Sequence, residues 1–529
     1  MATAEKSGIA PICAVLRRHR DLEGCGFRDR MLHDVHTFGH FPTSNSPRLP
    51  VVGTTMKSPA ANHERAVTRT FFALGSGEAM GRGISFLALL FLARVLGVEA
   101  FGVLELAVAI VIYGNRVADL GFDLGLGVRE IAAADDERRV RLLATALLLR
   151  GTLAVAIVGI LVAIGLLWLP SPEGQVIALY AVSLVAVGVG TRWLHLGLQR
   201  SRLVAATRVF GELVVLAIVL AVVRGPSDLP RVPLARIAGD VVAAIILFVG
   251  ALRLVRLRAG FDRAMARDLC RRGYPLVASA IFGLMIFNAD LIFLRVLEGR
   301  AAVGYYAAAY TVIAFLSNLG AAYSLSLLPA LTRLAGTPSA RAELYRTAHA
   351  HVMTVGLAIA VGGTLLAGPI VSLVFGEQYA RSALPLAILL WSVPLALTRD
   401  LPIMGLLSNR RERPIAILTG QAAGLNVMLN LALIPIWGLA GAAVATVITE
   451  LLRLALAVRA ARQVDFAGPS ARRYLRPIAA AAGMGAVIYV MRGLPLWIIF
   501  PAGIASWLGV LGALGALRRP PGGSFSLWV

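Results

Sequence analysis

Three arginines lie inside long apolar stretches of the chain instead of in the polar links between them. They are Arg82, Arg116 and Arg192. If these stretches cross a membrane, each charge is costly unless it faces a water-filled cleft or a partner. The guanidinium group stays charged and binds phosphate oxygens through two parallel hydrogen bonds. The three arginines are therefore substrate-binding candidates, and the chemistry that suits them is recognition of a diphosphate.

Each of these arginines also has a structural interpretation. Glu78 and Arg82 are four residues apart on one helix face, so they could neutralise each other. Arg116 and Asp119 lie near a predicted span end, where an arginine can extend its charge to the interface. Both interpretations stay open, and Arg192 is the weakest of the three candidates.

A second polar set lies in apolar stretches of the second half of the chain. It comprises Asn288, Asp290, Asn426 and Asn430. A carboxylate deep in a membrane can bind a coupling cation or proton, to which amide oxygens add ligands. The alternative is a set of hydrogen bonds that holds neighbouring helices together. The histidines and cysteines have no spacing typical of a metal site, so no metal and no catalytic residue are expected.

Helices must position these residues. The chain has 529 residues, of which 58% are hydrophobic and 15% charged, and its mean hydropathy is +0.77. Soluble domains are typically about 25% charged. We therefore predict an all-α polytopic membrane protein with about fourteen transmembrane helices. The predicted spans are about 71–96, 101–121, 142–169, 175–198, 204–223, 234–255, 274–297, 301–328, 351–375, 383–407, 415–437, 439–459, 475–492 and 495–517.

The links between the predicted spans alternate in charge. The odd-numbered links are short and mostly poor in arginine, whereas the even-numbered links hold many arginines, such as Arg256 and Arg258. The positive-inside rule then places the arginine-rich links and both termini in the cytoplasm, so we expect a protein of the inner (cytoplasmic) membrane. The net charge of +22 reflects this topology, and no nucleic-acid partner is expected.

A sequence repeat relates two halves of the apolar region. Arg94-Val95-Leu96 precedes Gly102, and Arg295-Val296-Leu297 precedes Gly304 six predicted spans later. An even separation gives the two halves the same orientation, which predicts two six-helix bundles in parallel repeat. Arg94 and Arg295 lie near outer span ends, where extension of the charge into water is the favoured interpretation.

The repeat divides the chain into four predicted parts. Residues 1–65 form a polar N-terminal extension that we expect to be disordered. Residues 66–256 and 273–462 form the two bundles, and residues 463–529 add two C-terminal helices and a short cytoplasmic tail. Pro394 and Pro402 bracket Arg399-Asp400 and predict a broken helix that could act as a hinge.

Four motifs carry a family likeness: Ala-Arg-Val-Leu-Gly at 93–97, Asp-Leu-Gly at 119–121, Gly-Tyr-Tyr at 304–306 and Gly-Ala-Ala-x-Ala-Thr at 441–446. The chain resembles the polysaccharide (O-antigen type) flippases of the multidrug/oligosaccharidyl-lipid/polysaccharide exporter superfamily. The resemblance covers roughly residues 70–460 and implies a transporter, not an enzyme. Such a protein flips an isoprenoid-diphosphate-linked oligosaccharide across the cytoplasmic membrane by alternating access.

The resemblance also implies partners. They are the lipid-linked oligosaccharide, membrane lipid, and a glycan polymerase or glycosyltransferase machinery. No cofactor is expected, and the chain has no GxxxxGK[ST] loop for direct ATP use. The alternative is a cation-coupled multidrug exporter of the same fold. Because the cleft candidates of the first bundle are mainly arginines, they disfavour a pathway for cationic drugs.

Overall fold

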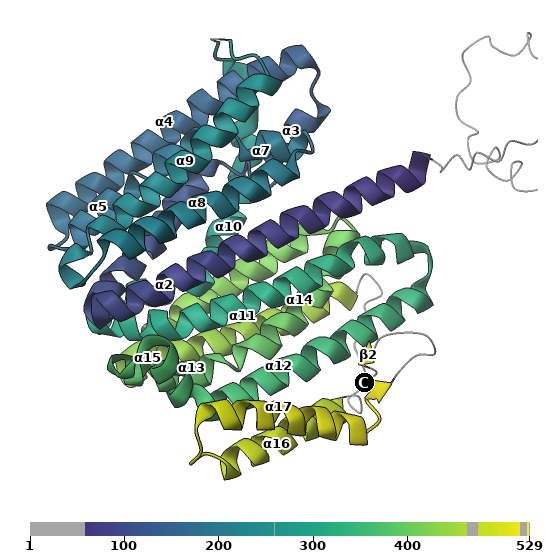
Figure 1. The fold of residues 1–529 in the computed structure, drawn as a ribbon. Helices are drawn as coiled ribbons and strands as arrows, with labels where there is room; N and C mark the ends of the chain where they lie inside the picture. Colours follow the sequence, from purple (N-terminus) through teal and green to yellow (C-terminus); the bar gives the residue numbers. More distant parts are fainter. Residues whose placement is uncertain (1–58, 259, 463–473, 519–525, 528–529) are drawn as a thin grey trace, which may run out of the picture. The chain divides into compact units, whose positions relative to one another are not determined.

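The computed structural model describes residues 59–258, 260–462, 474–518 and 526–527. The predicted extension 1–65 lies almost entirely outside the described residues, as does most of the predicted tail. The chain divides into two units, Met1–Asn62 and His63–Val529. All the helices that carry candidate residues belong to the second unit, which Figure 1 colours from purple to yellow.

Helices make up almost all of the described residues, in agreement with the predicted fold class. Two short strands, β1 (Leu517–Arg518) and β2 (Ser526–Leu527), pair antiparallel near the end of the chain. The helices of the first half are α2 (Pro59–Asp119), α3 (Leu126–Ala133), α4 (Asp136–Trp168), α5 (Glu173–Ala181), α6 (Leu184–Gly188), α7 (Arg192–Gly197), α8 (Ser201–Val222), η2 (Pro226–Asp228) and α9 (Arg231–Leu254). The helices of the second half are α10 (Arg263–Leu297), α11 (Arg300–Arg333), η3 (Leu334–Gly336), α12 (Pro338–Phe375), η4 (Glu377–Ser382), α13 (Ala383–Leu389), α14 (Ser392–Ser408), α15 (Glu412–Ala461), α16 (Leu475–Val490) and α17 (Leu496–Ala513).

Two of these helices are interrupted by a glycine near the middle of their apolar length. Gly97 in α2 has φ 75° and Gly438 in α15 has φ 53°, and neither has helical dihedrals. Glycine adopts positive φ without a steric penalty, which explains why the chain bends at these residues. A straight helix of the length of α15 would extend about 75 Å, more than twice the hydrocarbon thickness of a bilayer. We therefore interpret α2 and α15 each as two membrane crossings.

The number of spans depends on this interpretation. By length and composition, the described residues include ten helices able to cross a membrane, or up to eleven if α13 and α14 form one span bent by 41°. The count of fourteen also requires the division of α2 and α15, and inclusion of the shorter helix α16. The polytopic membrane architecture is confirmed, whereas fourteen crossings stay a prediction.

The helices of each half of the chain pack mostly on one another. In the first half, α4 packs on α5 and α6, and α8 packs on α9. In the second half, α15 contacts α10 and α14, while α11 and α12 also contact α14 (Figure 1). Helices α16 and α17 pack on each other and attach to α12. Helix α10 also contacts α3 and α4, so it touches both groups.

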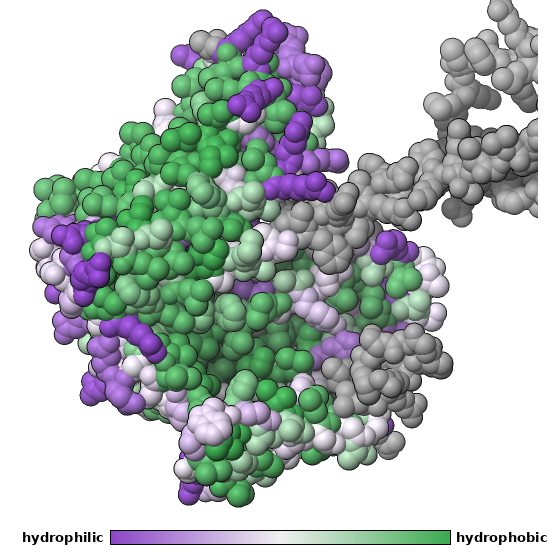
Figure 2. Space-filling view, in the orientation of Figure 1, coloured by the Kyte–Doolittle hydropathy of each residue, from purple (hydrophilic) through white to green (hydrophobic). Residues whose placement is uncertain are grey.

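The outer surface of the described helices is apolar. Figure 2 shows hydrophobic residues over most of the visible face, with hydrophilic residues gathered toward its edges. Val155, Leu167 and Trp497 are among the large hydrophobic side chains that are mostly exposed. Such exposure is expected of side chains that face lipid instead of water.

The predicted span 175–198 is broken into α5, α6 and α7. Breaks free backbone carbonyl groups, which must find other donors inside a membrane. Arg150 of α4 supplies them: its two terminal nitrogens donate to Gly190 O at 2.6 Å and Val187 O at 2.9 Å. The same side chain forms an ion pair with Asp119 at 3.1 Å, and both are almost fully buried. Arg150 thus stabilises the break.

Candidate functional site

Two of the three predicted arginines meet at one carboxylate. Arg192 donates to Glu78 at 2.5 Å, whereas Arg82 Nε lies 4.0 Å from the other oxygen of Glu78. Arg82 instead donates through Nη1 to the amide oxygen of Asn318 on α11. The expected Glu78–Arg82 pair is therefore weak, because Arg192 is the closer partner. The Arg82 side chain is 50% exposed, and its charge has no close carboxylate partner among the described residues.

Arg82 lies between the two halves and deep in the predicted membrane. It precedes Gly97 by fifteen residues, which corresponds to about 22 Å along the helix. One turn closer to Gly97, Phe86 of α2 stacks on Phe315 of α11 with ring centroids 4.6 Å apart. An aromatic contact between the halves therefore covers the Gly97 side of the arginine.

A second carboxylate on the first half gathers two arginines that the sequence analysis did not single out. Glu212 is buried and lies 2.9 Å from Arg208 and 3.1 Å from Arg236. Ser85 of α2 donates to its other oxygen at 2.6 Å. The signal in the sequence was the spacing of Arg208 and Glu212, which lie one turn apart on α8. The wall beside Arg82 is thus richer in arginine than predicted.

Arg116 does not join this group. It is half-buried, and no hydrogen bond or ion pair of its side chain occurs within the described part of the chain. Its expected neighbour Asp119 binds Arg150 instead. The structure therefore does not connect Arg116 with Arg82 and Arg192.

Three of the four predicted coupling-ion residues form one buried cluster. The Asp290 carboxylate accepts hydrogen bonds from Tyr306 at 2.7 Å, Asn430 at 2.7 Å and Thr446 at 2.8 Å. Asn430 also donates to the side-chain oxygen of Asn426 at 3.0 Å. These residues, the Asp290 cluster, come from α10, α11 and both parts of α15. All of these donors are neutral, and among the described residues no arginine forms an ion pair with Asp290.

The Asp290 cluster also has unused acceptor capacity. The side-chain oxygen of Asn430 is buried and has no hydrogen-bond partner among the described residues. An unpaired buried oxygen beside an uncompensated carboxylate is an arrangement that suits a small cation. Asn288 lies outside the cluster, since its amide donates to Leu284 O one turn earlier in its own helix at 3.1 Å. Sequence reasoning missed Tyr306 and Thr446, whose hydroxyl groups are common in membrane helices.

A neighbouring carboxylate is neutralised by arginine. Glu450 accepts from Arg399 and from Arg453, each at 2.5 Å, and Arg399 also binds Asp400 at 2.7 Å. All four side chains are largely buried. The Glu450–Arg453 ion pair, three residues apart on α15, belongs to this larger network. The chain breaks between α13 and α14 before Pro394, so the bend precedes the predicted hinge.

The two halves touch near the bend of α2 at Gly97. Arg94 donates to the carbonyl groups of Leu373 and Val374 at the end of α12. Tyr379 of η4 donates to Ala93 O at 2.8 Å. Arg94 is exposed, and its guanidinium group also binds these carbonyl groups, because the carbonyl groups at a helix C-terminus lack partners in the helix and attract a cation.

The related arginine of the second half makes the reciprocal contact. Arg295 binds Glu173 at the start of α5 through two hydrogen bonds of 2.7 and 2.9 Å, and Arg300 binds the same carboxylate. Extension of the Arg295 charge into water, the favoured interpretation, is therefore replaced by an ion pair. Each repeated arginine reaches the link between the third and fourth spans of the opposite half.

The repeated glycines let the halves approach closely at the same end. A Cβ atom on Gly102 would lie 2.3 Å from Arg300 O, and one on Gly304 would lie 2.0 Å from Val98 O. Real Cβ atoms do not come so close to backbone oxygen, so both positions require glycine. We call these glycine and arginine contacts the Gly97-end closure.

Glu105 is a buried carboxyl group that the sequence analysis overlooked. Its Oε1 atom is buried and has no hydrogen-bond partner among the described residues. The signal in the sequence was an acidic residue inside an apolar run of α2. Its place after Gly102 puts it close to the Gly97-end closure.

Comparison with known proteins then identifies the family. Residues 67–335, just over half of the chain, match the family model described as Polysaccharide biosynthesis protein. The chain belongs to this family. No curated protein sequence matches this polysaccharide biosynthesis protein at a significant level.

Solved structures establish its fold. The structure of "Lipid II flippase MurJ, inward closed conformation" is 11% identical, has a TM-score of 0.73, and is aligned over 83% of this chain and 98% of its own. An inward-facing multidrug resistance MATE transporter of the MOP superfamily is 16% identical, with a TM-score of 0.60 over 72% and 94%. A mutant of the Vibrio cholerae MATE transporter VcmN is 15% identical, with a TM-score of 0.51 over 76% and 98%. This polysaccharide biosynthesis protein therefore has the fold of MOP-superfamily transporters.

Proposed function

We propose that this protein flips an isoprenoid-diphosphate-linked oligosaccharide from the cytoplasmic leaflet to the outer leaflet of the inner membrane. The observation that carries the proposal is the position of Arg82. Its half-exposed cation lies between the two halves, where, among the described residues, it is hydrogen-bonded to a neutral amide and lies 4.0 Å from a carboxylate that Arg192 already occupies. A diphosphate would replace Asn318 as the partner of this guanidinium.

Alternating access accounts for the arrangement of the contacts between the halves. The Gly97-end closure and the Phe86–Phe315 stack both lie on the Gly97 side of Arg82. If the arginine-rich links face the cytoplasm, this side is the outer one, and the arginine site opens inward. Both termini are then cytoplasmic.

We further propose that a cation bound at the Asp290 cluster drives the transport cycle. The cluster lies in the second half, whereas Arg82 and Arg192 belong to the first. A cation and the anionic substrate would therefore occupy separate sites and bias the same equilibrium between inward and outward forms. Membrane potential adds about 2.3 kcal/mol per charge per 100 mV to such a step.

The test compares surface polysaccharide and inner-leaflet precursor in cells. Four strains are needed: wild type, a deletion, Arg82→Ala, and Arg253→Ala as an exposed arginine away from the site. Deletion and Arg82→Ala should both remove surface polysaccharide while the lipid-linked precursor accumulates, and Arg253→Ala should behave as wild type. Normal surface polysaccharide in the deletion, with greater drug sensitivity, would instead identify a multidrug exporter.

A further inference from the structure

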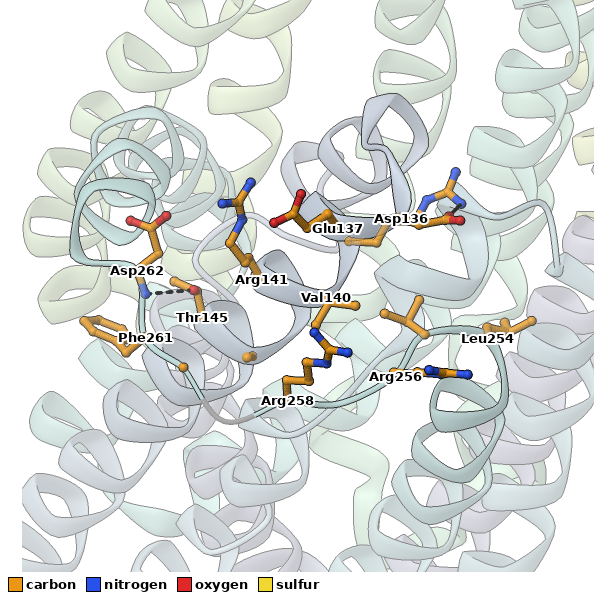
Figure 3. A pocket seen from close by; sticks show the side chains of 14 residues that line it. Asp136, Glu137, Val140, Arg141, Thr145, Leu254, Arg256, Arg258, Phe261 and Asp262 are labelled. Carbon is orange, nitrogen blue, oxygen red and sulfur yellow. Dashed lines mark hydrogen bonds and ion pairs between the residues drawn. The ribbon is translucent and has the colours of Figure 1, made fainter.

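A cavity of about 660 Å³ lies outside the two candidate sites, between the start of α4 and the link from α9 to α10 (Figure 3). Its floor is buried and includes Ala144, Thr145 and Val255. The Thr145 hydroxyl accepts the N–H group of Asp262 at 3.2 Å, which ties the link to α4. The cavity is therefore built from two connected elements.

Two of the three acidic residues of the cavity already have partners. Asp136 is paired with Arg139 at 2.9 Å. The Asp262 carboxylate caps α10 by accepting the N–H group of Met265 at 2.9 Å. Glu137 is the remaining acid of the lining and forms no ion pair within the described residues.

Three arginines of the lining are left without an acidic partner in the described part of the chain. They are Arg141 of α4 and Arg256 and Arg258 of the link, and all three are exposed. In Figure 3, Arg258 extends from the link toward Val140 of α4, with Arg256 on the side of Leu254. Together with Arg139, the four arginines of the lining exceed its three carboxylates by one, so the cavity carries a net positive charge.

The surroundings of the cavity are apolar. Its rim includes the exposed side chains of Leu254 and Phe261. Above Arg141 and Thr145, the same face of α4 continues with Leu148 and Val155, which are 49% and 61% exposed. Only 11% of the most apolar window of α4 is buried within the protein. An acyl chain could therefore lie along α4 from a head group held in the cavity.

We propose that this cavity binds the phosphate-bearing head group of an anionic membrane lipid. Arginine recognises a phosphate diester through forked hydrogen bonds, and basic pockets at the cytoplasmic ends of membrane helices bind such head groups. The continuous apolar face of α4 favours a lipid over a soluble phosphate compound. Because the link joins the two halves, the bound lipid would hold the link against α4.

The test uses the purified full chain in detergent and measures lipid retention by native mass spectrometry. The probes are phosphatidylglycerol, phosphatidylcholine and inorganic phosphate. The variant Arg256→Gln/Arg258→Gln is compared with Arg410→Gln/Arg413→Gln, which removes two exposed arginines from another link of the same predicted side. Loss of two charge-assisted contacts should weaken phosphatidylglycerol retention by at least about tenfold in the first variant.

The control variant should retain phosphatidylglycerol as wild type does, and phosphatidylcholine should be retained weakly by all three proteins. Equal loss in both double variants would overturn the proposal, because it would indicate general attraction to basic links. Displacement of the lipid by millimolar phosphate would identify a soluble phosphate site instead. Unchanged thermal midpoints without lipid verify that both variants fold.

Discussion

The two buried carboxylates of the second half differ in the charge of their partners. Asp290 is surrounded by neutral donors, namely Tyr306, Asn430 and Thr446, whereas Glu450 is bound by Arg399 and Arg453. A carboxylate that arginines already neutralise gains little from a cation. A carboxylate with neutral donors keeps a negative potential in a medium of low dielectric constant. Asp290, and not Glu450, is therefore the group suited to bind the coupling cation.

Asp290→Asn tests this assignment. The amide keeps the volume of the carboxyl group but removes its charge, so cation binding should be lost. We expect wild-type protein to be stabilised by sodium or by protons at concentrations above the dissociation constant, by about 2.7 kcal/mol at a hundredfold excess. The thermal midpoint of the variant should not respond to either cation.

Asn288→Ala is the matched control, because Asn288 lies two residues away and bonds only to its own helix. It should keep the cation response and normal surface polysaccharide. An undiminished sodium or proton response in Asp290→Asn would show that the coupling site lies elsewhere.

Arg192 has an indirect effect on Arg82 that a pair of variants can detect. The Arg192→Gln substitution removes the closer partner of Glu78. Glu78 can then pair with Arg82 and weaken its attraction for an anionic substrate. We expect this variant to lower surface polysaccharide. Because Glu78→Gln/Arg192→Gln removes the competing carboxylate, the double variant should recover export. Failure to recover would mean that Arg192 binds substrate directly, and an unaffected single variant would contradict the shared role of Glu78.

The sequence predicted the Asp290 cluster better than the arginine site. Asn426 and Asn430 are four residues apart, so any helix places them on one face, and Asp290 is at a similar depth on α10. For Arg82, the sequence was compatible with either a diphosphate or Glu78 as the partner. Spacing along the chain does not show that Glu78 binds Arg192, which is 114 residues away. Arg116 has the residue type but forms no contact with Arg82 or Arg192 in the described part of the chain, because which face of a helix meets the other half depends on packing.

At the scale of the element, the repeat produces two reciprocal contacts of different chemistry. Arg94 binds helix-terminal carbonyl groups, while Arg295 binds the Glu173 carboxylate. The sequence showed the repeat but not its purpose, since each arginine contacts a residue of the opposite half. Opening the Gly97 end must break both contacts, so their strengths set the balance between the open and closed forms.

Glu173→Gln should shift this balance toward the open form. The substitution keeps hydrogen-bonding atoms but removes the charge that binds Arg295 and Arg300, at a cost on the order of 2 kcal/mol to the closed form. A cysteine at Val98, introduced after Cys13, Cys25 and Cys270 are replaced by serine, should then react more than tenfold faster with an impermeant maleimide.

Glu99→Gln provides the comparison, because Glu99 is an exposed acid of the same turn with no ion pair among the described residues. It should leave the labelling rate of the Val98→Cys reporter unchanged. Equal acceleration by both variants would mean that general charge, and not the Glu173 contact, controls access.

Gly304→Ala addresses the close approach directly. Its new methyl group would lie 2.0 Å from Val98 O, so the closed form should lose about 1–3 kcal/mol and the same Val98→Cys reporter should label faster. Gly159→Ala in α4 meets no atom within 4 Å and should leave both stability and labelling unchanged or slightly improve the helix. Wild-type labelling in Gly304→Ala would show that the halves are not pressed together at this end.

At the scale of the whole molecule, the all-helical membrane architecture was predictable and the count of crossings was not. Hydropathy and the alternation of arginine in the links predicted the helices, because lipid requires apolar length and the membrane sets the charge asymmetry. The breaks within α5–α7 could not be predicted, since they depend on Arg150, which lies on another helix and supplies the missing donors. Gly97 and Gly438 decide whether two long helices cross the membrane once or twice.

Accessibility of single cysteines resolves that count. If α2 and α15 each cross twice, the bends at Gly97 and Gly438 lie in water on the outer side, because a bend with unpaired backbone groups is costly in lipid. Cysteines at Glu99 and Leu439 should therefore label with an impermeant maleimide in whole cells. Cysteines at Arg138 and Arg410 should label only after the membrane is permeabilised. Were α2 a single crossing, Glu99 would lie within the hydrocarbon and resist labelling in both conditions, and the two halves would no longer share one orientation.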